Sequence, residues 1–195
     1  MMRPLPALLA CAAIVLAGAG VARAGEGESA LSLGLAYGSY LVPDGEDGSL
    51  APAGGAVLAV EYERAFGEAF SLRGELAGAI YGGGGLAYAG MADVGLVYRL
   101  DVLKYVPYLV VAAGVAYGGG GPLGGDLDDD GDAECEPGDA DCGGGLVPLV
   151  QAGAGLDVLR SRDTSWGVEL RFAPPLADTT FMSLGVRYTR RWGYF

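Results

Sequence analysis

Histidine is absent from the 195-residue sequence, and lysine occurs only at Lys104. Without histidine the chain lacks the commonest general base and the imidazole ligand of many metal sites, which excludes Ser-His-Asp and Cys-His catalysis. The glycine runs at 82–85 and 118–121 are not followed by the Lys-Ser or Lys-Thr pair of a phosphate-binding loop. We therefore predict that the protein is not an enzyme and holds no cofactor, a calcium ion apart.

Long apolar runs are also missing after the N-terminal segment. The run at 106–117 is too short to cross a membrane as a helix, which needs about 20 residues. The longer stretch at 76–98 contains four consecutive glycines, which disfavour a helix and suit a turn. A membrane crossing would therefore use strands, and only a closed barrel satisfies the backbone hydrogen bonds of such strands in lipid.

Residues 1–24 are typical of a cleaved secretory signal peptide, with a basic start, an apolar run over 5–21 and a small-residue cleavage site ending at Ala24. An uncleaved anchor helix and a lipoprotein signal ending at Cys11 are the alternatives. Cleavage leaves one domain, residues 25–195, and removes Arg3 and Arg23, so the net charge changes from −12 to −14. A chain this acidic is expected to repel nucleic acid and anionic lipid.

Eight stretches alternate apolar and polar residues with the period of two that is typical of strands. In the first of them, Leu33 and Leu35 fall on one face and Gly34 on the other. The stretch at 105–117 is apolar on both faces, so its register cannot be read from the sequence. We expect strands at 29–40, 56–65, 70–81, 86–100, 105–117, 146–159, 165–172 and 181–190.

An even number of such strands predicts an all-β fold, an eight-stranded antiparallel up-and-down transmembrane barrel. The connections after the second, fourth and sixth strands are short, whereas those at 41–55 and 118–145 are long. Short turns are expected in the periplasm and long loops outside, with both termini in the periplasm. The polar face is mostly Gly, Ala and Ser with a few charges, which suits a narrow interior. A soluble lipocalin-like barrel, with its apolar face inward, is the alternative.

Aromatic residues are expected to form a girdle at each membrane interface. The external girdle would comprise Tyr37, Tyr40, Tyr81, Tyr88, Tyr117, Phe172 and Phe181. The periplasmic girdle would comprise Tyr62, Phe66, Phe70, Tyr98, Tyr105, Tyr108, Trp166, Tyr188, Trp192, Tyr194 and Phe195.

In outline, residues 29–195 resemble the outer-membrane β-barrel superfamily of small OmpA-like and OmpW-like proteins. The segment 106–117, VPYLVVAAGVAY, is similar to the family's PY-x-x-x-G-x-G fifth strand, although Ala112 stands where glycine is common. The segments 151–157, QAGAGLD, and 183–188, SLGVRY, resemble the sixth and closing strands. The family's terminal aromatic is present as Phe195, but Arg191 shares its parity. We therefore expect either a bulge near Arg190 and Arg191 or a strand that ends there, followed by a tail over 192–195.

Charged residues on the polar face would form a network inside the barrel. An eight-stranded interior is only wide enough for side chains, so acids and bases there should pair and plug the barrel. A narrow ion path gated by the same pairs is the alternative. The predicted network comprises Glu61, Glu63, Arg73, Glu75, Asp93, Arg99, Asp157, Glu169, Arg171 and Arg187.

The external loop at 118–145 contains nine acids and no base. Its acids recur at every second position with Gly131 at the sharp turn, as at the start of an EF-hand loop, although Pro137 stands where the bidentate Glu belongs. The segment looks closer to the calcium repeats of thrombospondin type 3. A Cys135–Cys142 disulfide is expected in an exported protein. The candidate Ca²⁺ ligands are Asp126, Asp128, Asp130, Asp132 and Glu134.

Together these patterns predict a protein of the Gram-negative outer membrane with a structural or surface-interaction role. Its partners would be outer-membrane lipid, a surface partner that the sequence does not identify and Ca²⁺, but not nucleic acid. The alternatives are a narrow channel for small solutes or ions and the soluble periplasmic ligand-binding barrel.

Overall fold

The structure is a computed structural model that describes residues 27–44, 49–67, 69–82, 87–100, 104–119, 146–161, 163–174 and 180–193; for 41–44 and 49–52 it describes the backbone only. Within these ranges no helix is long and apolar enough to cross a membrane. The strands are β1 (Ser29–Asp44), β2 (Ser49–Ala65), β3 (Phe70–Gly82), β4 (Ala87–Arg99), β5 (Tyr105–Gly119), β6 (Leu146–Leu159), β7 (Thr164–Ala173) and β8 (Thr180–Trp192).

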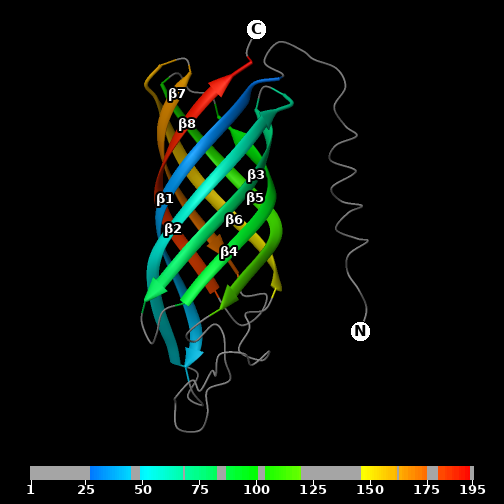
Figure 1. Cartoon of the computed structure of the whole chain (residues 1–195). Coiled ribbons are helices and arrows are strands. Elements are labelled where there is room, and N and C mark those ends of the chain that lie inside the picture. Colours follow the sequence, from blue (N-terminus) through cyan, green and yellow to red (C-terminus); the bar gives the residue numbers. More distant parts are fainter. Residues whose placement is uncertain are drawn as a thin grey trace, which may run out of the picture.

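The strands form one closed barrel in sequence order, and every neighbouring pair is antiparallel. The last strand closes the barrel by pairing with β1 from Ser29↔Trp192 to Leu41↔Thr180. The first strand begins and the last strand ends at the same end of the barrel (Figure 1). The predicted eight-stranded up-and-down fold is thus confirmed.

Most of the large apolar side chains point outward, because successive strand residues face opposite sides of a sheet. Leu33 is 55% exposed and Leu184 is 60% exposed, while the inward-facing Arg73 is 1% exposed. This is the reverse of a soluble barrel, whose apolar side chains would fill the centre. The lipocalin-like alternative is therefore wrong.

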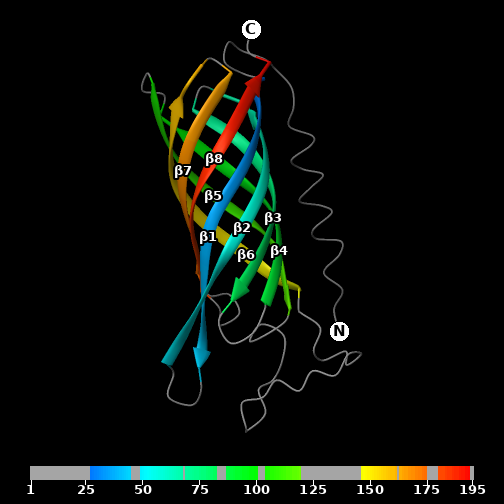
Figure 2. The same cartoon turned by 60° about the vertical axis from the view of Figure 1, so that its left-hand side comes forward.

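The β1–β2 hairpin is longer than the sequence suggested. Residues 41–55 were expected to be a loop, but β1 continues to Asp44 and β2 starts at Ser49, and the two pair as far as Asp44↔Ser49. Pairing of β1 with β8 stops at Leu41, and pairing of β2 with β3 begins at Gly54. The end of the hairpin is therefore a two-stranded ribbon that projects beyond the barrel (Figure 2). Proline and glycine in this stretch read as loop signals, yet the two segments satisfy each other's backbone.

The C-terminal strand differs from both expectations. Its register against β1 advances without interruption as far as Trp192, so no bulge interrupts the pairing and the strand does not end at Arg190. Arg191 consequently points inward and is buried, while Trp192 points outward. Phe195, which suggested the discontinuity, lies outside the described residues.

Outward aromatics cluster toward both ends of the barrel, but four of the predicted girdle residues face the interior. Tyr40 and Tyr81 are buried inside and meet edge to face with ring centroids 4.8 Å apart. Phe181 packs beside them, and Tyr108 is buried at the centre of the charged interior. Their placement in the girdles was wrong, because an aromatic near a strand end faces the lipid only if its parity is the outward one.

Candidate functional site: the charged interior of the barrel

The structure places all ten residues of the predicted network on the inner face, on six of the eight strands. Eight of them are buried, and the side chains of Arg99 and Arg171 are only slightly exposed. Their proximity follows from register, because facing residues such as Glu61↔Glu75 and Glu63↔Arg73 lie side by side on one wall. Asp93 faces Glu75 on the next strand, whereas Arg171 and Arg187 reach these residues from across the barrel.

Arg187 joins two walls of the barrel. Its Nε and Nη2 donate to Asp157 Oδ1 and Oδ2 at 3.0 and 2.9 Å, which is a bidentate pair. Its Nη1 donates to Glu61 Oε2 at 2.8 Å. The guanidinium also lies over the ring of Tyr108, 4.5 Å from the centroid. All of its N–H-bearing nitrogens are thus bonded to carboxylates.

Glu169 is surrounded by cations. Arg73 Nη1 donates to its Oε2 at 2.9 Å, Arg171 Nε donates to its Oε1, and Arg187 Nη1 lies 3.4 Å from Oε2. The Tyr108 hydroxyl donates to Oε2 as well. A buried carboxylate is expensive to desolvate unless it is paired and hydrogen-bonded, and this one is satisfied on both oxygens.

Arg171 links three carboxylates. Its Nη2 donates to Glu61 Oε1 at 2.5 Å, its Nη1 donates to Glu75, and its Nε donates to Glu169. These acids come from β2, β3 and β7, so one side chain ties together strands on opposite sides of the lumen. The arrangement fills the cross-section with ion pairs.

Two acids mark the ends of the network. Glu63 accepts from Arg99 Nη2 at 2.6 Å and from the Ser71 hydroxyl. Asp93 accepts from Gln151 Nε2 at 2.8 Å and forms no ion pair with any described residue. Asp93 is therefore an acid of the network whose hydrogen-bond donor is an amide and not a guanidinium.

Three participants were missed by the sequence analysis. Arg191 Nη2 donates to Asp157 Oδ2 at 2.9 Å, and its Nη1 donates to Ser165. Its parity matches that of Arg187, which would have placed it inside had the strand been extended. Gln151 has the inward parity of Asp157, but it is uncharged and was not included in the predicted network. Tyr108 gave no signal, because β5 is apolar on both faces.

The outer half of the lumen is apolar. Beyond Asp93, Gln151 and Arg171, no described inward side chain carries a charge toward the long-loop end. Tyr40 and Tyr81 pack here with small residues of the first four strands, and the apolar cluster comprises Tyr40, Ala53, Val57, Ala59, Ala77, Ala79, Tyr81 and Ala87. Beside the charged network, a lumen cavity of about 30 Å³ lies next to Arg187 and Glu169, room for about one water molecule.

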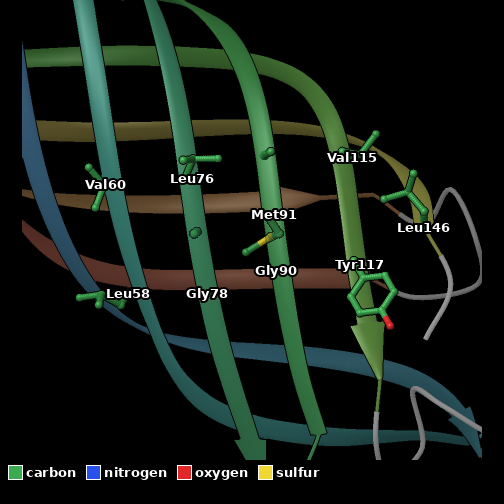
Figure 3. Close-up of a pocket in the computed structure, with 11 residues that line it drawn as sticks. Leu58, Val60, Leu76, Gly78, Gly90, Met91, Val115, Tyr117 and Leu146 are labelled. Carbon is green, nitrogen blue, oxygen red and sulfur yellow. The ribbon is translucent and has the colours of Figure 1, made fainter. Parts of the chain in front are cut away.

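A second hollow lies on the outside of the barrel. It is a groove of about 500 Å³ lined by outward side chains such as Leu58, Leu76 and Val115 (Figure 3). Its floor includes Gly78 and Gly90, which are cross-strand partners and offer no side chain. Because the groove opens on the apolar outward face, it adjoins lipid and is no solute site of the lumen.

The predicted calcium loop and its two cysteines lie outside the described residues, as does the predicted signal peptide. Elsewhere, in the strands and turns that the structure describes, no group of three or more acids, cysteines or histidines is arranged to hold a metal ion. The disulfide and the calcium site stay predictions.

No family model and no curated protein matches this chain. Among solved structures, Neisserial surface protein A is similar, with a TM-score of 0.61 at 9% identity over 87% of this chain and 100% of that one. Ail, the attachment invasion locus protein of Yersinia pestis, has a TM-score of 0.58 at 17% identity over 86% and 99% of the two chains. Ail in a phospholipid bilayer nanodisc has a TM-score of 0.51 at 18% identity over 86% and 100%.

At these low identities the similarity shows a shared fold and not a shared function. The apolar outward face is the independent physical reason to place the barrel in lipid, because such a face in water would be an aggregation liability. The chain therefore has the fold of the small eight-stranded β-barrels of the Gram-negative outer membrane, and its outward face fits that location.

Proposed function

We propose that this chain is a non-enzymatic outer-membrane barrel with a structural or surface-interaction role, and that its interior is closed. The observation that supports the proposal is how the described inward side chains occupy the two halves of the lumen. Ion pairs centred on Arg171 and Arg187 cross one half, and the apolar cluster around the Tyr40–Tyr81 pair lies in the other. A lumen closed in this way leaves the outer surface and the external loops as the parts that meet partners.

Conductance in planar bilayers tests the closed interior. The refolded mature chain should give no channel steps, with a known porin added afterwards to the same bilayer as a check that the membrane accepts barrels. Heat-modifiable gel mobility of the same preparation verifies that the strands have folded into the complete barrel. Steady, reproducible steps from the purified chain would instead favour the narrow channel.

The external loops of this chain differ in charge from a polyanion-binding surface. Ail has been crystallised in complex with the heparin analogue sucrose octasulfate. In this chain the outer connections 45–48, 83–86, 120–145 and 175–179 contain no lysine or arginine. We therefore favour a cation as the ligand of the external face over a sulfated or phosphorylated polymer.

Ca²⁺ is the cation that the loop chemistry fits best. Hard carboxylate oxygens at alternate positions from Asp126 to Glu134 suit Ca²⁺, and a Cys135–Cys142 bridge would order the segment. An affinity in the millimolar range is expected, as in other extracellular sites. Calorimetry should detect heat with CaCl₂, and less heat after reduction or in a Cys135→Ser, Cys142→Ser variant. If no heat is measured in either redox state, the calcium proposal is contradicted, whereas the proposal that the lumen is closed is unaffected.

A further inference from the structure

Two arginines on the outward face flank β1 near the short-turn end of the barrel. Arg64 of β2 is the register partner of Ser29, and Arg190 of β8 is the partner of Leu31. Both side chains are exposed and have the outward parity of their strands. Their strands lie on either side of β1, and their positions differ by two residues along it. Their Cα atoms are therefore roughly 12 Å from each other. Arginine side chains can bridge such a separation toward one ligand.

An aromatic pair crosses the same surface on the other diagonal. Tyr62 is the partner of Leu31, Trp192 is the partner of Ser29, and their ring centroids lie 6.4 Å apart. The Tyr62 hydroxyl lies 3.2 Å from Ser29 Oγ. Half-exposed tyrosine and tryptophan side chains mark the headgroup level of a membrane. The two guanidiniums therefore lie at the depth of lipid phosphates.

Neither arginine has a carboxylate partner among the described residues. All five inward arginines, by contrast, form at least one ion pair: Arg73, Arg99, Arg171, Arg187 and Arg191. Glu28, the acid next to Ser29 in the chain, pairs with Arg191. Within the part of the chain that the structure describes, no carboxylate competes for the donors of the two outward guanidiniums.

Charge is unevenly distributed along the barrel. The exposed cations that the structure describes all lie near the short-turn end: Arg64, Lys104, Arg160 and Arg190. The net charge alone predicted repulsion of anionic lipid. Most carboxylates lie in the lumen or toward the long-loop end, whereas Glu26, Glu28, Glu68, Asp101 and Asp163 belong to the short-turn end. The short-turn end is therefore not positive as a whole, and an anionic headgroup would be attracted by the arginine pair itself and not by a basic rim.

We propose that Arg64 and Arg190 bind the phosphate of an anionic glycerophospholipid, such as phosphatidylglycerol, in the periplasmic leaflet. Guanidinium groups bind phosphate oxygens in a bidentate fashion, and the aromatic pair supports the glycerol backbone. The exposed Leu31 and Leu33 continue along β1 below the headgroup and receive an acyl chain. The proposal requires the barrel to lie in a membrane, but it is independent of the closed lumen and of calcium.

Native mass spectrometry of the folded mature chain tests the site. The barrel in mild detergent is given equal amounts of phosphatidylglycerol and phosphatidylcholine with identical acyl chains, and the bound lipid is counted. The variants are Arg64→Gln, Arg190→Gln and the double variant. Arg160→Gln is the matched control, because it removes the same charge from a turn away from β1. Heat-modifiable mobility verifies that each variant is folded.

Wild type and Arg160→Gln should both prefer phosphatidylglycerol. Each single variant at the site should lower the preference about fivefold and the double variant about 30-fold, since each lost hydrogen bond to the phosphate is worth about that factor. Equal binding of the two lipids by wild type, or a preference that survives the double substitution, would overturn the proposal. So would an equal loss in Arg160→Gln, because net charge alone would then explain the preference.

Discussion

Arg187 and Asp157 form a two-bonded ion pair inside the barrel, with Nε–Oδ1 and Nη2–Oδ2 distances of 3.0 and 2.9 Å. The pair joins β8 to β6 across the inner face of β7, where Gly167 is the register partner of both residues. A side chain at Gly167 would occupy this space, since a Cβ there would lie 2.2 Å from Asp157 Oδ1. Glycine on the middle strand thus lets the two charges meet.

Removal of the guanidinium should destabilise the barrel strongly. Arg187→Met leaves Asp157 and Glu61 buried with one partner fewer, and breaking a buried pair from one side costs about 3 to 5 kcal/mol. Urea unfolding in lipid vesicles, followed by tryptophan fluorescence, measures the loss. The double variant Arg187→Met, Asp157→Asn should recover part of the stability. A double variant no more stable than the single one would show that the pair is not the source of the effect.

The two acids Asp93 and Glu169 should respond in opposite ways to the same chemical change. Glu169→Gln removes the charge that faces Arg73, Arg171 and Arg187, so it should destabilise the barrel by about 3 kcal/mol or more. Asp93→Asn removes a buried charge held by the Gln151 amide alone, so its effect should be near zero or stabilising. Unfolding midpoints of the two variants decide this, and equal destabilisation would contradict the charge distribution described above.

Glycines on the two faces should differ in their tolerance of a methyl group. A Cβ at Gly155 would lie 2.2 Å from the ring of Tyr108, whereas nothing lies within 4 Å of a Cβ at Gly78. Gly155→Ala should therefore cost about 1 to 3 kcal/mol through overpacking of the interior, and Gly78→Ala should cost little. The folded fraction on unboiled gels over a urea series measures both. If Gly155→Ala and Gly78→Ala unfold alike, Tyr108 does not occupy the lumen as placed here.

Much of this fold could be predicted because a strand buries one face and exposes the other, so period two reveals the number of strands and the sorting of charges such as Arg73 and Glu169. Residues without that contrast could not be placed. Tyr108 lies on a strand that is apolar on both faces, and the role of Arg191 depended on how far β8 extends. The β1–β2 ribbon was missed because Pro43 and Pro52 suggest a loop. Beyond the barrel, however, β1 and β2 are both edge strands, and edge strands tolerate proline.

The individual contacts of the interior are a property of the closed barrel and not of any one strand. Arg171 meets Glu61 and Glu75 only after β7 has come to face β2 and β3 across the lumen. Sequence alone indicated that these charges would share a space, but which acid each arginine would bind depends on the barrel's register and tilt. The outward pair Arg64 and Arg190 escaped notice for the same reason, because β1 brings them together.

The direction in which the apolar face of the barrel points can be measured on β8 in a bilayer. A spin label is placed in turn at Met182, Ser183, Leu184, Gly185 and Val186 of the refolded chain, with its native cysteines replaced by serine. Collision rates with lipid-soluble oxygen are then measured at each position. A barrel with its apolar face in lipid should give high oxygen accessibility at 182, 184 and 186 and low accessibility at 183 and 185. High accessibility at 183 and 185 instead, or no alternation at all, would contradict a barrel with its apolar face in lipid and its charges inside.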